Sequence, residues 1–137
     1  MLKRIGICLG LGLLLCLAGC GEKDPPNTKI RDLEFTVQGE NNLPEELQTI
    51  IQDKKTQEFK VTYQNGNDLY ICMGYGEQIT GGYSISVNEL YLAENAVYFD
   101  TTLIGPEPGT VSEDKKAPSY PYVVVKTEYI DKVIVFQ

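Results

Sequence analysis

The 137-residue chain contains no histidine and no tryptophan, and the first absence limits the chemistry it can perform. Histidine is the usual general base beside a nucleophilic serine or cysteine, so a hydrolase of that type lacks its commonest proton acceptor here. Nine tyrosines and 13 glycines are present instead. This composition favours a β-rich binding or structural module over an enzyme, and we expect no catalytic residues, no cofactor and no metal.

Positive charge is also scarce. The chain has 12 Lys and Arg against 19 Asp and Glu, a formal net charge of −7. Removal of an N-terminal leader that carries Lys3 and Arg4 would lower the basic count from 12 to 10 and leave a net charge of −9. Affinity for nucleic acid comes mainly from Lys and Arg at phosphates, so no nucleic-acid partner is expected.

The N-terminus follows the pattern of a bacterial lipoprotein signal. Met1–Arg4 is a short positive segment, and the uncharged run Ile5–Ala18 is shorter than the roughly 20 residues that cross a bilayer. The run ends in Leu17-Ala18-Gly19-Cys20, which resembles a lipobox. We therefore expect a signal peptide over 1–19, a palmitate-bearing Cys20 and a flexible tether over 20–29. An uncleaved anchor helix and an ordinary signal peptide are the alternatives.

Lipidation would place the rest of the chain outside the cytoplasm. Each acyl methylene buried in lipid contributes about 0.8 kcal/mol, so Cys20 would hold the protein on a membrane of the bacterial cell envelope, at its extracytoplasmic face. Residues 30–137 are long enough for a single globular domain. Cys8 and Cys16 would leave with the leader, so Cys72 would be the one thiol of the mature chain, which we interpret as a small buried hydrophobe.

One amphipathic helix is predicted near the start of the domain, over Leu43–Lys54. Pro44 would occupy its first helical position, with Asn42 or Leu43 as the cap. Leu43, Leu47, Ile50 and Ile51 are spaced so that they form one apolar stripe. We expect this stripe to pack on a sheet; a helix that binds a partner is the alternative.

The rest of the domain consists of strand-like runs. An Asn-Gly turn at 65–66 predicts a first hairpin, and Glu94-Asn95 a second. The continuous apolar run after Ser119 indicates a strand buried on both faces. The expected fold is α+β and β-dominated: an antiparallel, sandwich-like barrel of about six or seven strands with the one helix. The predicted strands are 30–37, 58–63, 69–73, 83–92, 96–103, 120–126 and 132–136.

The stretch Gly76–Val87 joins the two hairpins. Nucleotide and calcium binding are two functions to consider for this stretch and the turn before it. The Gly-x-Gly sequence at 74–76, which leads into this stretch, lacks the third glycine and the following helix of a dinucleotide-binding loop. Asn65, Asn67 and Asp68 lack the spacing of a calcium loop. We interpret the stretch as a glycine-shaped turn in which Gly81 and Gly82 provide positive φ for a turn or bulge that aims the next strand.

The second half of the chain, over about 68–137, resembles the C-terminal domain of the PrcB family, named for the lipoprotein subunit of a bacterial surface protease complex. The resemblance rests on Thr80-Gly81-Gly82-Tyr83, on Ser119-Tyr120-Pro121-Tyr122 and on the terminal Val133-Ile134-Val135-Phe136. It implies association with an extracellular protease. Residues 80–83 are also similar to the Thr-Thr-Gly-Tyr loop of chagasin-like cysteine protease inhibitors.

These observations predict a non-catalytic, membrane-anchored lipoprotein module that binds another envelope protein, with a secreted or surface protease as the first candidate. A chagasin-like inhibitor and a surface binder of small molecules or glycans are the alternatives. An enzyme that uses the carboxylates of Asp100 and Glu107 is disfavoured, because nothing specifies their distance. The expected partner-binding residues are Gln78, Ile79, Thr80, Gly81, Gly82, Tyr83, Glu107 and Tyr120.

Overall fold

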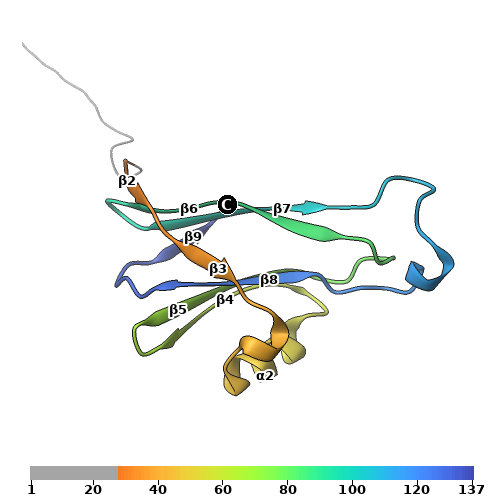
Figure 1. Cartoon of the computed structure of the whole chain (residues 1–137), viewed down its shortest axis with the longest axis horizontal. Coiled ribbons are helices and arrows are strands. Elements are labelled where there is room, and N and C mark those ends of the chain that lie inside the picture. Colours follow the sequence, from red (N-terminus) through yellow and green to blue (C-terminus); the bar gives the residue numbers. More distant parts are fainter. Residues whose placement is uncertain (1–27) are drawn as a thin grey trace, which may run out of the picture.

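The computed structural model describes residues 28–137, and it is a sandwich of two four-stranded sheets with one α-helix on its outside (Figure 1). The predicted signal peptide, Cys20 and most of the predicted tether lie outside the described residues. The β-dominated sandwich is confirmed, although its sheets do not close into a barrel. No helix within residues 28–137 has the length and apolar character needed to span a bilayer.

The strand order is β2-β6-β7-β9 in one sheet and β3-β8-β5-β4 in the other. Two short 3-10 turns, Glu40–Asn42 and Glu113–Lys115, lie in the connections. The elements are β2 (Lys29–Asp32), β3 (Phe35–Val37), α2 (Glu45–Lys54), β4 (Glu58–Asn65), β5 (Asp68–Tyr75), β6 (Ser84–Ala93), β7 (Val97–Ile104), β8 (Tyr122–Glu128) and β9 (Ile134–Phe136).

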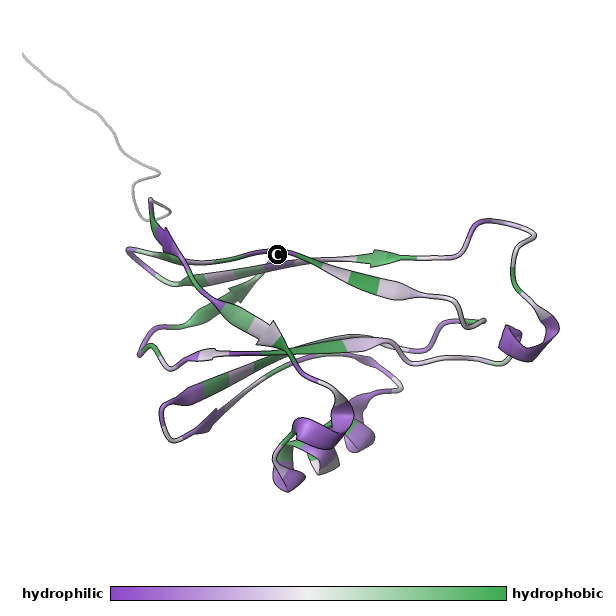
Figure 2. Ribbon diagram, viewed as in Figure 1, coloured by the Kyte–Doolittle hydropathy of each residue, from purple (hydrophilic) through white to green (hydrophobic). Residues whose placement is uncertain are grey.

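The main core lies between the two sheets, and its centre is formed by β5 and β8. Ile71 and Val125 face the β6–β7 layer and are fully buried. Their neighbours Cys72 and Val124 face the other way and pack with the residues under α2. The prediction of a β8 buried on both faces is therefore confirmed, and Figure 2 shows the green, hydrophobic stretch of this strand.

Helix α2 covers the outer face of the β3-β8-β5-β4 sheet. Leu43, Leu47 and Ile51 are buried there against Phe59 and Tyr70, which confirms that the apolar stripe packs on a sheet. The helix begins at Glu45, one residue after the predicted first helical position. Pro44 is its N-cap rather than its first helical residue, because the backbone of Pro44 is still extended (ψ 144°).

The predicted strand over 30–37 is two strands, which belong to different sheets. Residues Lys29–Asp32 pair with β6, whereas Phe35–Val37 pair with β8. Leu33 lies at the crossing, where its backbone N–H donates to Leu90 O (3.0 Å) and its side chain is buried. This division raises the number of strands in the described residues to eight.

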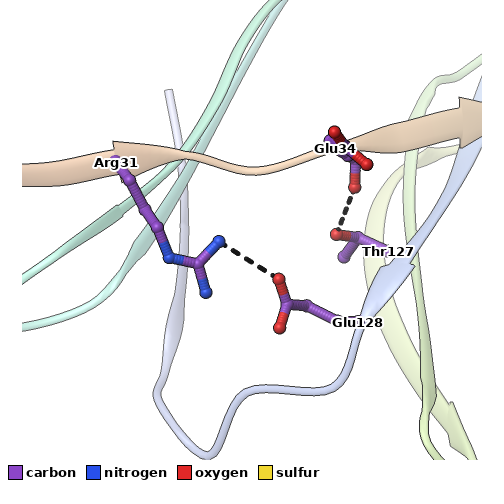
Figure 3. Close-up of polar contacts among 4 residues, drawn as sticks. All are labelled: Arg31, Glu34, Thr127 and Glu128. Carbon is purple, nitrogen blue, oxygen red and sulfur yellow. Dashed lines mark hydrogen bonds and ion pairs between the residues drawn. The ribbon is translucent and has the colours of Figure 1, made fainter.

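Side-chain bonds hold the crossing in place (Figure 3). The Thr127 hydroxyl donates to Glu34 O at 2.7 Å, and Arg31 Nη1 lies 3.2 Å from Glu128 Oε2. Both contacts join the first strands of the domain to β8, which is more than 90 residues away in the chain. The N-terminal segment thus ties the two sheets together.

Both predicted hairpins are present, but the last strand differs from the expected antiparallel arrangement. Gly66 has φ +65° in the turn between β4 and β5, as the Asn-Gly signal requires. A register shift in β6 lies between Val87 and Glu89. Strand β9 pairs with β7 in parallel, because the chain first passes through β8 in the other sheet.

Candidate functional site

The predicted site lies at one end of the sandwich, where the chain leaves β5 and β7 and re-enters at β6 and β8 (Figure 1, right). Two long connections meet there, residues 76–83 and residues 105–121. Under them, the Tyr75 hydroxyl and Thr101 Oγ1 are 2.6 Å apart and form a hydrogen bond between β5 and β7, one strand from each sheet. The two connections therefore start from a fixed base.

The first connection is anchored to the second by a short stretch of β-pairing. Gln78 N–H donates to Ser119 O at 2.8 Å, and Ser119 N–H donates to Gln78 O at 3.0 Å. One step closer to the sheet, Tyr75 N–H donates to Pro121 O at 3.0 Å. The Gln78 amide also donates to Tyr75 O, at 3.1 Å. Gln78 is thus a fixed, half-buried part of the scaffold.

Hydrogen bonds to the second connection also hold Thr80 and Gly81, which follow Ile79 in the turn. The Ser119 hydroxyl donates to Thr80 O at 2.7 Å, and Gly81 N–H donates to Lys115 O at 2.7 Å. A Cβ atom at Gly81 would lie 3.4 Å from Lys115 Cβ, so the second connection packs directly on the glycine. Two fixed points therefore flank Ile79, one before it and one after it.

Ile79 is the most exposed large hydrophobic side chain of the described residues, with 80% of its surface accessible. Its neighbours Gln78 and Thr80 are half-buried and bonded to Ser119. An apolar side chain on a backbone that is already fixed loses little conformational freedom when a partner covers it. Of the eight predicted binding residues, Ile79 is the one that the structure places best for contact with a partner.

Gly82 and Tyr83 shape the turn, and of the two only Tyr83 is half-buried, whereas Gly82 is exposed. Gly82 has φ +85°, and a Cβ atom there would lie 3.2 Å from Pro106 Cβ. The predicted positive φ is confirmed for Gly82, whereas Gly81 does not adopt it. The Tyr83 ring packs on Gly105, where a Cβ atom would lie only 2.9 Å from its Cε2. Tyr83 is half-buried and fixes the start of β6.

Glu107 and Tyr120 occupy the second connection, but they face different surroundings. The exposed Glu107 accepts bonds from Thr110 at its backbone oxygen, and no hydrogen bond within residues 28–137 joins it to residues 78–83. Tyr120 follows Ser119, yet Lys55 at the end of α2 lies over its ring, with Nζ 5.5 Å from the ring centroid. Tyr120 is therefore engaged with the helix.

A hollow of about 230 Å³ lies beside the turn, between the two connections. Lys115, on the short 3-10 turn, contributes the one charged side chain of its lining. Next to it, the hydrogen bond from the Ser112 hydroxyl, helped by the charge of Lys115, holds the pKa of the exposed Asp114 carboxyl below its usual value. The lining residues are Gly82, Pro106, Thr110, Val111, Ser112 and Lys115.

Two residues essential to this geometry, Lys115 and Ser119, are absent from the predicted set. Both act through backbone atoms, and Ser119 also through its hydroxyl, on residues more than 30 positions earlier. Residues 105–119 are rich in proline and charge, so the local pattern indicates only a solvated loop. No signal in the sequence pairs this loop with the turn at 76–83.

Together, fold and site define a small β-sandwich domain in which one end is built from two loops fixed by long-range bonds. Residues 69–128 match the family model described as PrcB C-terminal. This match confirms, over these residues, the resemblance to the PrcB C-terminal domain family that is expected from the sequence. The match runs from β5 to the end of β8, so it includes the turn and both loops, but neither α2 nor β9.

No match to the chain was found among curated proteins or among solved structures. Within residues 28–137, no group of three or more acidic, cysteine or histidine side chains is gathered in a way that could hold a metal ion.

Proposed function

We propose that this protein is a non-catalytic lipoprotein module of the bacterial cell envelope that binds another envelope protein through the loop end of its sandwich. A secreted or surface protease is the first candidate partner, because the family name refers to a protease complex. The observation that carries the proposal is Ile79, which is 80% exposed between two hydrogen-bonded neighbours. Binding surfaces commonly centre on such an apolar anchor held by a rigid support.

The position of β2, the first described strand, agrees with a membrane-anchored protein that binds at its far end. β2 begins beside Ala93, at the end of β6, whereas the candidate loops lie at its start, Ser84 (Figure 1). β6 has 10 residues, so at about 3.3 Å per residue the two ends of the sandwich are roughly 30 Å apart. A lipid on Cys20 would leave the loop end facing away from the membrane.

The cysteine of the described residues, Cys72, is not placed as a nucleophile. Cys72, the free cysteine of this part of the chain, is buried, and burial raises the pKa of its thiol to about 12. A thiol with so high a pKa is almost entirely protonated at neutral pH and is a poor nucleophile. This agrees with a packing role for Cys72 and with a module that acts by binding.

Affinity capture from detergent-solubilised envelopes tests the proposed binding surface. Ile79→Asp should lose the proteins that the wild-type chain recovers, because it places a charge at the centre of the contact. Val133→Asp is the matched control, since Val133 is 67% exposed and lies at the opposite end, next to the start of β7. Equal recovery by the wild type and both variants would refute the assignment of the surface.

The anchor is tested separately. Cys20→Ser should abolish incorporation of labelled palmitate and release the protein from the membrane fraction. If Cys20→Ser stays in the membrane fraction and the wild-type chain takes up no palmitate, the lipid anchor is wrong, whatever the outcome of the capture experiment.

A further inference from the structure

We propose that the hollow beside the turn binds the free carboxyl terminus of the partner protein, with the last side chain in the hollow and the terminal carboxylate on Lys115. This inference rests on the proposed function and names the part of the partner that is recognised. Three properties of the hollow support such binding: its size, its lining and its charge.

The size fits one apolar side chain. A cavity of about 150 Å³ is enough to bind benzene, and this hollow has about 230 Å³. Pro106 and Val111 give it apolar walls, and both are half-buried. Gly82 also lines it and contributes no side chain that would fill it. The lining therefore leaves room for an aliphatic group from outside.

The charge of the hollow is opposite to that of the protein. The chain has a net charge of −7, yet the charged side chain in this lining is a lysine. Within the described residues, no hydrogen bond or ion pair engages the Lys115 ammonium group, although Asp114 lies close enough to feel its charge. By contrast, Lys116 is paired with Glu113 at 2.7 Å. Lys115 is thus free to take a carboxylate from a ligand.

A free chain end supplies both groups from one residue. The terminal carboxylate and the last side chain leave the same Cα atom, which suits a hollow whose lining combines apolar walls with an adjacent lysine. The Lys115 backbone is already held by Gly81, with Gly81 N to Lys115 O at 2.7 Å, so the lysine has a fixed attachment to the turn. Capture of a terminal carboxylate is a known mode of peptide recognition.

Titration of the ¹⁵N-labelled protein with three synthetic peptides tests the proposal. The first is acetyl-Gly-Ser-Gly-Ser-Leu with a free carboxyl end, the second is its amide, and the third is the amide of acetyl-Gly-Ser-Gly-Asp-Leu. We expect the free acid to shift the amide signals of Gly82, Val111 and Lys115, with an affinity about tenfold above that of the first amide, the size of one charge-assisted hydrogen bond. Equal binding of the acid and its amide would overturn the proposal, as would binding of the aspartate peptide as tightly as the free acid.

Two variants distinguish a specific contact between Lys115 and the carboxylate from a general electrostatic attraction of the peptide to the protein. Lys115→Gln should lose most of the preference for the free acid, whereas Lys116→Gln removes the same charge one residue away and should keep it. Equal losses in both would overturn the proposal. If Ile79→Asp prevents capture of the envelope partner while Lys115→Gln captures it as the wild type does, the proposed function stands and this inference fails.

Discussion

Replacement of Gly74 by alanine should destabilise the protein, although the same change in most strands would stabilise it. Gly74 is paired directly with Phe59 across the β4–β5 hairpin. A Cβ atom at Gly74 would lie 2.0 Å from Phe59 Cε1, so the ring would have to withdraw by about 1.5–2 Å to restore a normal contact. Phe59 has little room to do so, since it is 8% exposed and packed under α2.

The magnitude follows from two opposing effects. Removal of the glycine alone should add about 0.5–1 kcal/mol of stability, because the unfolded chain loses freedom. Overpacking of a well-filled core costs about 1–3 kcal/mol, and movement of the ring into solvent would cost a similar amount. We therefore expect a net loss of about 1–2 kcal/mol in the free energy of unfolding. Urea unfolding followed by circular dichroism measures it.

Two comparisons make the reasoning refutable. Gly39→Ala is the matched control, since a Cβ atom at Gly39 meets nothing within 4 Å, and it should leave stability unchanged or slightly raised. Phe59→Ala, itself costly by about 3–5 kcal/mol, removes the clashing ring, so Gly74→Ala should cost nothing in that background. An equal cost of Gly74→Ala with and without the Phe59 ring would show that the ring does not cause the loss of stability.

Three further predictions concern packing and the site. Leu47→Ala should lower the free energy of unfolding by about 2–5 kcal/mol, measured in urea, because Leu47 is fully buried on the face of α2 that packs on the sheet; a smaller loss would mean that α2 barely contributes to the core. Since burial raises the pKa of Cys72 to about 12, its thiol should stay protonated up to pH 10 and react with a disulfide reagent only after unfolding; rapid labelling of the native protein at pH 8 would contradict its burial. Ile79→Asp should change stability by no more than about 0.5 kcal/mol, so any loss of partner capture cannot be assigned to unfolding, which a melting curve checks.

Local patterns in the sequence determined the elements of this fold. The Asn-Gly pair at 65–66 fixes a tight turn because its glycine accepts φ +65°, and the apolar spacing from Leu43 to Ile51 fixes the buried face of α2. The continuous apolar run of β8 likewise indicated burial on both faces. These features depend on neighbouring residues alone, so the sequence is sufficient to predict them.

Only the tertiary structure decided how these elements combine. The run 30–37 has one strand-like pattern, yet Leu33 turns it from one sheet into the other, because each half finds a different partner strand. Likewise, β9 is parallel to β7 because β8 between them belongs to the other layer.

In the candidate site, too, some features follow from the local sequence and others only from the tertiary structure. The sequence predicted the turn at 76–83 and its glycines, since turn geometry is local. It could not predict that Ser119 and Lys115 would fix this turn through backbone bonds, nor that Tyr120 would lie under Lys55. Such contacts join segments more than 30 residues apart, and they form only when both sheets are assembled.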